Sequence, residues 1–308
     1  MVRAITQRHR PDIVMRGTAK HSSQAFYAAI FVGPFLLLYI GLLVYPLILG
    51  IGISFNRADL FGAREWIGLE NYTRLLGDPI FHQAVGNTFK LAFLIVPAVT
   101  AITLALAIAL NHATRTAAIF RGIFFSSSVL SVTIVTLIWR FILTPDAGLV
   151  AKALTPLGIE PMPFLSDPNL TLPAVAMATI WWSLGLPMMM FLAGLQQIPS
   201  DIYEAAAIDR ASRWTVFWRV TLPSLRRTVV LVFMLQTAAQ LQIFGQAQLL
   251  TGGGPGGASR PIVLFVYELA FGRWELGYAM AASEILFLLV LMLTIVQYWA
   301  VGRNADSK

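Results

Sequence analysis

The chain has 308 residues, of which 57% are hydrophobic and only 12% are charged, and its mean hydropathy is +0.71. Soluble domains carry about 25% charged residues, so this composition excludes an ordinary soluble domain and indicates an integral membrane protein. The absence of cysteine excludes disulfide bonds and thiolate metal sites. Loops held on the cytoplasmic side by Lys and Arg explain the formal net charge of +7 better than nucleic-acid binding does.

Six apolar stretches are long enough to cross a bilayer as helices, since one crossing takes about 20 residues. We expect them at about 25–53, 89–110, 120–142, 171–195, 228–250 and 277–301. The first is too long for the apolar core of a cleavable signal peptide and lacks a small-residue cleavage site, so we expect a retained span. The predicted fold class is an all-α integral membrane protein, with six transmembrane helices over 25–301 and tails at 1–24 and 302–308.

The charges on either side of these spans predict their orientation, because cytoplasmic loops are enriched in Lys and Arg. Five cations precede the first span: Arg3, Arg8, Arg10, Arg16 and Lys20. If these residues are cytoplasmic, six spans place both termini inside. The cytoplasmic segments then hold 14 cations and five acids, whereas the external loops hold six cations and nine acids. This asymmetry supports the orientation, and it places the segment between the fourth and fifth spans in the cytoplasm.

That segment, YEAAAIDRASRWTVFWRVTLP at 203–223, is charged and prone to form helices. Pro199 followed by Ser200 or Asp201 as N-cap predicts a short helix that runs to about Asp209. Ser212 can cap a second helix. The apolar residues of this second helix recur on one face: Trp214, Phe217, Trp218 and Leu222. Two interpretations remain open, a hairpin that docks a cytoplasmic partner and a connector that lies on the membrane surface.

The same segment resembles the EAA loop of ABC-importer permeases, whose pattern is E-A-A, then D-G-A, then I-x-L-P. The matching residues are Glu204, Ala205, Ala206, Asp209, Ala211, Leu222 and Pro223. Arg210 stands where the family usually has glycine. If that turn needs a positive φ, an arginine there costs about 1 kcal/mol. The resemblance implies that the loop, 200–223 here, inserts into a cleft of an ATPase subunit and transmits its closing motion to the membrane helices.

Four further segments resemble the sugar and glycerol-phosphate branch of this family, at 68–88, 137–150, 181–206 and 250–259. The resemblance covers about 28–300, with the transmembrane core at about 84–297, and implies a type I importer permease (MetI-like) fold in the inner membrane. It implies half of an alternating-access path for a sugar or a related polyol or glycerol phosphate, and no enzyme activity. The implied partners are a second permease, expected to be a different chain, two ATPase subunits that hold ATP and Mg, and an extracytoplasmic solute-binding protein.

Polar side chains within two spans are candidates to line that path. Glu284 is the one acid well inside a span, where an ionisable group is costly unless paired or hydrated. Amides can bond the hydroxyls of a polyol, and three of the glutamines in the fifth span lie in its outer half: Gln240, Gln242 and Gln246. Aromatic rings available to stack on a sugar are Trp181, Trp182 and Phe244. Alternatively, the glutamines only join helices, and Glu284 pairs with a partner's cation or is protonated.

The glycine-rich segment TGGGPGGAS at 251–259 lacks the lysine of a phosphate-binding loop, so we expect an external turn-rich loop and no bound nucleotide. His82 and His112 have no second ligand nearby, so neither a metal nor another cofactor is expected on this chain. Two rival functions remain. One is an ion-coupled secondary transporter or channel that uses Glu284. The other is a membrane-embedded enzyme, for which no H-E-x-x-H or G-x-S-x-G motif occurs.

Overall fold

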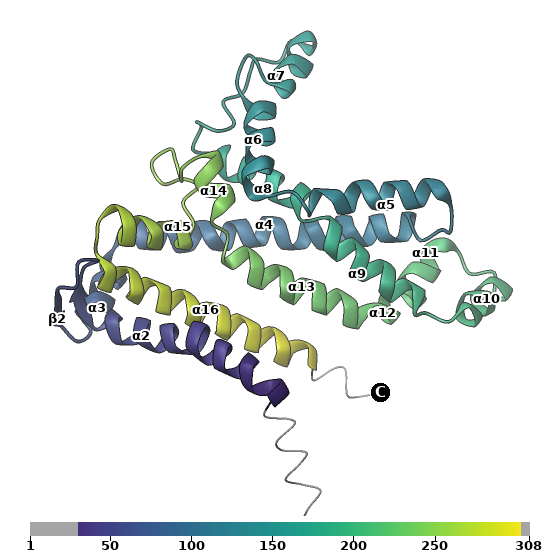
Figure 1. Cartoon of the computed structure of the whole chain (residues 1–308). Coiled ribbons are helices and arrows are strands. Elements are labelled where there is room, and N and C mark those ends of the chain that lie inside the picture. Colours follow the sequence, from purple (N-terminus) through teal and green to yellow (C-terminus); the bar gives the residue numbers. More distant parts are fainter. Residues whose placement is uncertain (1–29, 303–308) are drawn as a thin grey trace, which may run out of the picture. The chain divides into compact units, whose positions relative to one another are not determined.

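The computed structural model describes residues 30–302, which are mostly helical (Figure 1). The five N-terminal cations of the predicted tail 1–24, and residues 303–308, lie outside the described residues. The chain divides into two compact units, with the boundary between Gly52 and Ile53. The described part of the first unit is helical, with the π-helix η1 (Ile40–Val44) followed by α2 (Tyr45–Ser54). The π turn ends at Val44, two residues before Pro46, whose ring nitrogen has no hydrogen to donate within the helix.

The second unit opens with a small antiparallel hairpin of strands β1 (Asn56–Ala58) and β2 (Arg64–Trp66). Helix α3 (Glu70–Gly77) follows it. The buried side-chain amide of Asn71 donates hydrogen bonds of 2.8 and 3.0 Å to the backbone carbonyls of Ser54 and Asn56. These bonds fix the start of the hairpin on α3.

Helix α4 (Pro79–Ala109) begins at a strong start signal, in which the carboxylate of Asp78 accepts the backbone N–H of Ile80 at 2.8 Å. The helix therefore starts well before the predicted span 89–110, and it passes through Pro97 without ending. The hydrophobic core lies along α4. Phe81 near its start packs with α15 and α16, Leu91 in its middle packs with α8, and Ala107 near its end packs with α9.

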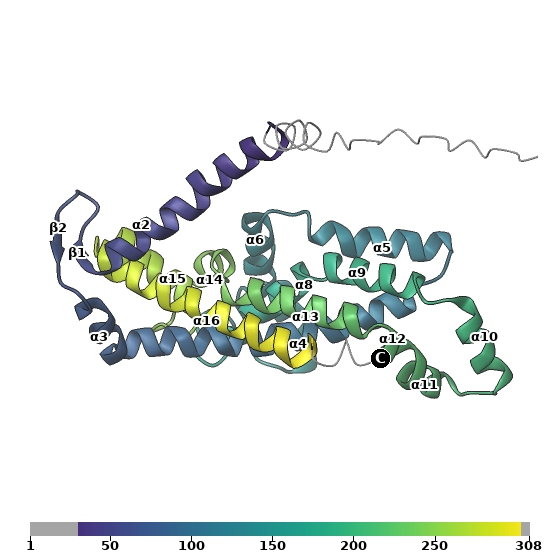
Figure 2. The ribbon, with the colours of Figure 1, turned by 90° about the horizontal axis from the view of Figure 1, so that it is seen from below.

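Two predicted spans are sharply bent. The third, predicted at 120–142, is made of α5 (Arg115–Ser127) and α6 (Val132–Leu143), which meet at 99°. The fourth, predicted at 171–195, is made of α8 (Thr171–Trp182) and α9 (Gly185–Gln196), which meet at 47°. Each of these two predicted spans is therefore built from two helices with a break between them. Figures 1 and 2 both show α6 turning away from α5.

The fifth predicted span, 228–250, is also interrupted. Helix α13 (Arg226–Leu241) ends after 16 residues, and α14 (Gly245–Leu250) begins after a short break. By length and composition, the described residues hold three helices able to cross a membrane, or up to five if each bent pair forms one span. The last of the three uninterrupted spans is within α16 (Leu276–Gly302).

Short helices connect these longer ones. The polar segment after α6 holds α7 (Leu149–Leu154) and the 3₁₀-helix η2 (Thr155–Leu157). The remaining short elements are α10 (Ser200–Ile208), α11 (Arg213–Val216), the π-helix η3 (Phe217–Thr221), α12 (Leu222–Ser224), α15 (Ile262–Tyr267) and the π-helix η4 (Glu268–Gly272). Figure 1 shows α3 and α10 at opposite ends of α4.

Candidate functional site

The segment 200–223 forms the predicted helical hairpin. Its first helix, α10, begins at Ser200 with Pro199 as N-cap and without a side-chain cap, so the prediction that Ser200 or Asp201 caps this helix was wrong. Glu204 and Ala205 are exposed along α10, and Ala206 is half-buried. Two of the residues expected to meet an ATPase therefore face outward from this chain.

The turn after α10 has the geometry that the missing glycine would favour. Arg210 has φ of 51°, its backbone N–H bonds to the carbonyl of Ala207, and the N–H of Ala211 bonds to the carbonyl of Ala206, each at 3.0 Å. This pair of bonds is the Schellman arrangement that ends many helices. The turn therefore has the positive φ at which a residue with a side chain costs about 1 kcal/mol.

The second half of the hairpin is capped and closed by hydroxyl groups. Ser212 accepts the backbone N–H of Thr215 at 3.1 Å, which confirms it as the predicted N-cap of α11. The hydroxyls of Tyr203 and Thr221 lie 3.3 Å apart and join α10 to η3. The π-helix η3 ends two residues before Pro223, as η1 ends before Pro46.

An aromatic cluster marks the outer face of this second half. The ring centroids of Trp214, Phe217 and Trp218 lie 5.1–6.0 Å apart, and Trp214 remains 70% exposed. On its inner side the hairpin encloses a cavity of about 370 Å³ against the end of α4, lined among others by Ile108 and Tyr203. The hairpin is therefore seated at the end of α4 and presents aromatic and charged side chains outward.

The predicted path residues are spread over four helices. The carboxamide of Gln240 is buried and donates to Gln236 at 3.1 Å, and that of exposed Gln242 donates to the carbonyl of Ala238 at 3.1 Å. Both amides are thus engaged within their own helix. The half-buried Glu284 lies on α16, and within residues 30–302 no ion pair involves it.

The remaining path candidates lie at the start of α14, which packs against α6 and α8, and at the end of α8. Gln246 is buried on α14, and the Phe244 ring lies 5.2 Å from that of Tyr267. Trp181 and Trp182 end α8, and the Trp182 indole donates to the carbonyl of Leu130 at 3.0 Å. Trp181 lines an apolar cavity of about 440 Å³ to which none of the predicted glutamines contributes. The structure therefore does not gather the predicted path residues into one pocket.

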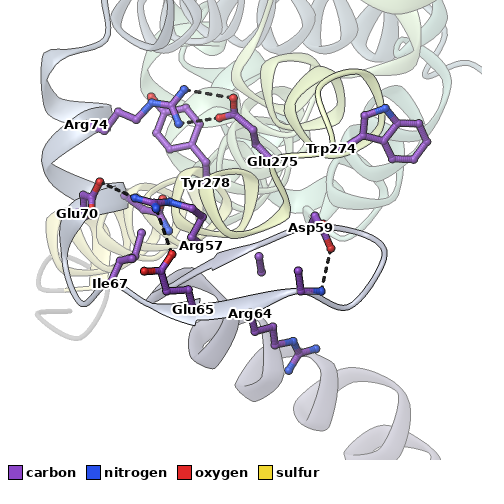
Figure 3. Close-up of a pocket in the computed structure, with 13 residues that line it drawn as sticks. Arg57, Asp59, Arg64, Glu65, Ile67, Glu70, Arg74, Trp274, Glu275 and Tyr278 are labelled. Atoms are coloured by element: carbon purple, nitrogen blue, oxygen red, sulfur yellow. Dashed lines mark hydrogen bonds and ion pairs between the residues drawn. The ribbon is translucent and has the colours of Figure 1, made fainter.

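Sequence reasoning missed a charged pocket of about 520 Å³ at the opposite end of α4, between the β-hairpin, α3 and the start of α16 (Figure 3). Arg74 forms an ion pair with Glu275 at 2.7 Å, and its guanidinium lies 4.1 Å above the ring of Tyr278. The hydrogen bond to Glu275 raises the pKa of Arg74 above its ordinary value. The Tyr278 hydroxyl donates to Asp78 at 2.9 Å. We call Arg74, Asp78, Glu275 and Tyr278 the Arg74 network.

Arg57 adds two more ion pairs to this pocket, with Glu65 at 3.1 Å and Glu70 at 3.2 Å. The sequence showed these side chains only as charges in two separate loops. The cross-strand pair of Arg57 and Glu65 needed the strand register, and the Arg74 network joins residues about two hundred positions apart. No local pattern identifies such a pair.

The glycine-rich loop is folded against α4. Its glycines 252, 253, 256 and 257 all have positive φ, as expected of a turn-rich loop. The buried amide of Asn87 on α4 donates to the carbonyls of Gly257 and Arg260 at 2.8 and 3.1 Å. Arg260 in turn forms an ion pair with Glu268 at 2.9 Å.

Comparisons with known proteins agree with this architecture. The model of a family described as a binding-protein-dependent transport system inner membrane component matches residues 68–304. A multiple sugar-binding transport system permease of Streptococcus mutans is 34% identical over 263 residues, covering 85% of this chain and 90% of the relative. A trehalose/maltose transport system permease of Thermococcus litoralis is 32% identical over 271 residues, covering 88% of this chain and 91% of the relative.

Two further matches extend this similarity. A sulfoquinovosyl glycerol transport system permease of Agrobacterium fabrum is 30% identical over 281 residues, covering 91% of each chain. A chain from the crystal structure of a bacterial ABC transporter that imports alginate superposes with a TM-score of 0.84, covering 93% of this chain and 99% of that chain. The sequence identity of this pair is 22%, so the match shows that the two chains share a fold and nothing more.

Proposed function

Because the chain belongs to the family of binding-protein-dependent transport system inner membrane components, and is a permease subunit of an ATP-driven importer, we propose that it carries a sugar or a related polyol or glycerol phosphate. Three of the relatives that match most of its length are named for sugars or for a sugar-bearing glycerol. The observation that carries the proposal is the exposed hairpin 200–223, which presents the matching E-A-A residues at one end of α4. Family membership leaves the ion-coupled transporter and the enzyme without support.

The permease acts with separate subunits. The family implies ATPase and binding-protein partners, and a solved structure with the same fold is in complex with a periplasmic protein that holds an alginate pentasaccharide. We propose two ATPase subunits that bind ATP and Mg²⁺, and a second permease of a different chain that completes the path. In this proposal the loaded binding protein docks outside and ATP closes the ATPases. The hairpins then move and open the cavity outward, and hydrolysis resets it inward.

The proposed orientation places both termini and the hairpin in the cytoplasm and the Arg74 network outside. The two features lie at opposite ends of α4, which supports their exposure on opposite sides of the membrane (Figure 1). The absence of native cysteine allows a direct test with single introduced cysteines. In sealed spheroplasts, an impermeant maleimide should label Phe61→Cys, which is 82% exposed on the β-hairpin loop, and spare Ile208→Cys, which is 82% exposed on α10. If only Ile208→Cys is labelled, the orientation is the opposite of the one proposed.

The coupling role is tested by isolating the complex from detergent-solubilised membranes with the native chain and with Glu204→Lys. We expect the native chain to retain an ATPase and a second permease, and the variant to lose the ATPase while it keeps the second permease. Glu160→Lys is the matched control, since Glu160 is an exposed acid outside the hairpin. If the native chain purifies alone and moves solute without ATP, the proposal is wrong.

The path residues remain proposals, of which Gln246 is the strongest because it is buried where α14 meets α6 and α8. In proteoliposomes holding the whole importer, we would measure uptake of radiolabelled monosaccharides, disaccharides and glycerol 3-phosphate. Gln246→Leu should lower uptake of the transported compound without lowering ATP hydrolysis. Gln297→Leu, which changes a glutamine bonded to Thr237, is the control. Equal uptake by both variants would remove Gln246 from the path.

A further inference from the structure

The bends of α5–α6 and α8–α9 meet and are tied together by hydrogen bonds. The hydroxyl of Ser128 accepts the backbone N–H of Gly185 at 3.1 Å and donates to the carbonyl of Trp182 at 3.3 Å. In return, the indole of Trp182 donates to the carbonyl of Leu130 at 3.0 Å. Backbone groups freed by a break inside a membrane must find partners within the protein. Here each break supplies partners for the other. We call residues 127–130 with 181–185 the joint.

The joint is also tightly packed. A Cβ atom added to Gly185 would meet the Ser128 hydroxyl and lie 2.9 Å from the Cα of Phe125. Small residues allow membrane helices to approach this closely. The two bent elements therefore cannot slide past each other at this point without breaking the Ser128 bonds.

The joint lies on a continuous route from the hairpin to the predicted path. Helix α9 leads into α10 within four residues, so a displacement of the hairpin acts directly on α9. From α9, Gly185 contacts Ser128 at the α5–α6 bend. Beyond the bend, α6 packs on α14, where a Cβ on Gly245 would lie 3.0 Å from Val132. The far end of this route carries Phe244 and Gln246.

We propose that Ser128 is a positioning residue that passes the displacement of α9 to α6, and through α6 to α14. This inference rests on the proposed coupling role of the hairpin. The physical basis is that one hydroxyl bonds two of the backbone groups at the α8–α9 break, the carbonyl of Trp182 and the N–H of Gly185. Coupling between sites needs an element that both sites act on, and the joint is that element.

The test uses spin labels in the assembled importer, since the chain has no native cysteine. One label on Leu76→Cys, 68% exposed on α3, serves as a reference. It is paired either with Met189→Cys on α9 or with Phe141→Cys on α6, both of which are exposed. Distances between the labels are measured by electron paramagnetic resonance without nucleotide and with ATP, Mg²⁺ and vanadate.

With the native joint, we expect both distances to change when ATP and vanadate close the ATPases. In Ser128→Ala the change at Met189 should persist, while the change at Phe141 should be largely lost. Ser126→Ala is the matched control on the same helix, because its hydroxyl bonds only the carbonyl of Ile123, at 2.8 Å.

Two results would overturn the inference, and they are distinguishable. If the change at Phe141 is as large in Ser128→Ala as in the native chain, the joint does not transmit the motion, although the hairpin can still couple the ATPase. If neither distance changes in the native chain, the proposed function of the hairpin is wrong and the inference falls with it. A variant that merely misfolds would lose both changes, unlike the selective loss expected here.

Discussion

The two ends of α4 carry elements that are held together in different ways. At the end near Asp78, the Arg57 ion pairs join the β-hairpin to α3, and the Arg74 network joins α3 to α16, which is about two hundred residues away in sequence. At the other end, the hairpin 200–223 is held by local bonds: the Schellman turn at Arg210, the Ser212 cap, and the contact of Tyr203 with Thr221. Among the ion pairs of residues 30–302, none involves this hairpin.

This difference separates an element built to keep its shape from one built to bind. One long-range ion pair, Arg74 with Glu275, and two local ones of Arg57 restrict the first element from several sides, so its geometry is set by the chain itself. The hairpin 200–223 leaves the side chains of Glu204 and Asp209 exposed. Because these side chains are not held by the rest of the described residues 30–302, they are available to contact a partner protein. Substitutions at each end of α4 test this difference.

The largest effect is expected at Gly277, where α16 touches the β-hairpin. A Cβ there would meet the carbonyl oxygen of Asn56 and lie 3.1 Å from the backbone nitrogen of Ala58. Gly277→Ala must push β1 away and should cost about 3 kcal/mol, at the upper end of overpacking. Thermal unfolding of the purified importer measures the loss. Gly272→Ala is the control, since nothing lies within 4 Å of its added Cβ, and an equal loss in both variants would refute the close contact.

The second effect concerns Arg74. Its side chain is about half exposed, so the ion pair with Glu275 alone is worth at most about 1 kcal/mol after solvent screening. The position above the Tyr278 ring adds about 0.5–1 kcal/mol. Arg74→Met should therefore destabilise the importer more than Arg57→Met, whose ion pairs are more exposed. A larger loss of melting temperature in Arg57→Met would contradict this ranking.

The contrast also separates what the sequence can predict from what it cannot. The hairpin was predictable in outline because its determinants are local: Ser212 before a helix, and the turn position of Arg210. The choice of Ser200 or Asp201 as a cap failed, because the extended backbone of Pro199 starts α10 without a side-chain bond. The Arg74 network was beyond prediction, since its partners meet only after α3 and α16 pack.

The apolar segments, too, were predictable only as far as their determinants are local in the sequence. Hydropathy identified the apolar stretches. It does not report whether the helix axis changes direction within a stretch, so it could not predict the bends of 99° and 47°. The bends depend on partners at another break, such as Ser128 for Gly185. The path residues were chosen for their chemistry alone, and the structure spreads them over several helices because depth along a span does not fix the face of a helix.

A third effect tests the local bonding of the hairpin. Ser212→Ala removes the oxygen that accepts the N–H of Thr215 and should weaken α11 by about 1 kcal/mol. Amide hydrogen exchange should then speed up about fivefold at Thr215 and its neighbours. Ser200→Ala is the control, because the Ser200 hydroxyl caps no backbone N–H. Faster exchange in both variants would mean that the cap assignment is wrong.

The smallest effect is a gain. Arg210 holds a left-handed conformation at the end of α10, and glycine adopts this conformation without the steric cost of a Cβ. Arg210→Gly should therefore stabilise the end of α10 by about 1 kcal/mol. Hydrogen exchange should then slow about fivefold at the amide of Ala211 and at the amides of the last turn of α10. Arg219→Gly, inside the helical run that α11 and η3 form together, should have the opposite sign because glycine weakens a helix interior. If Arg210→Gly instead speeds exchange, the guanidinium must stabilise the turn by more than its backbone strain costs. A side-chain contact would then stabilise the hairpin 200–223, as side-chain contacts stabilise the Arg74 network, and the two ends of α4 would no longer differ in this respect.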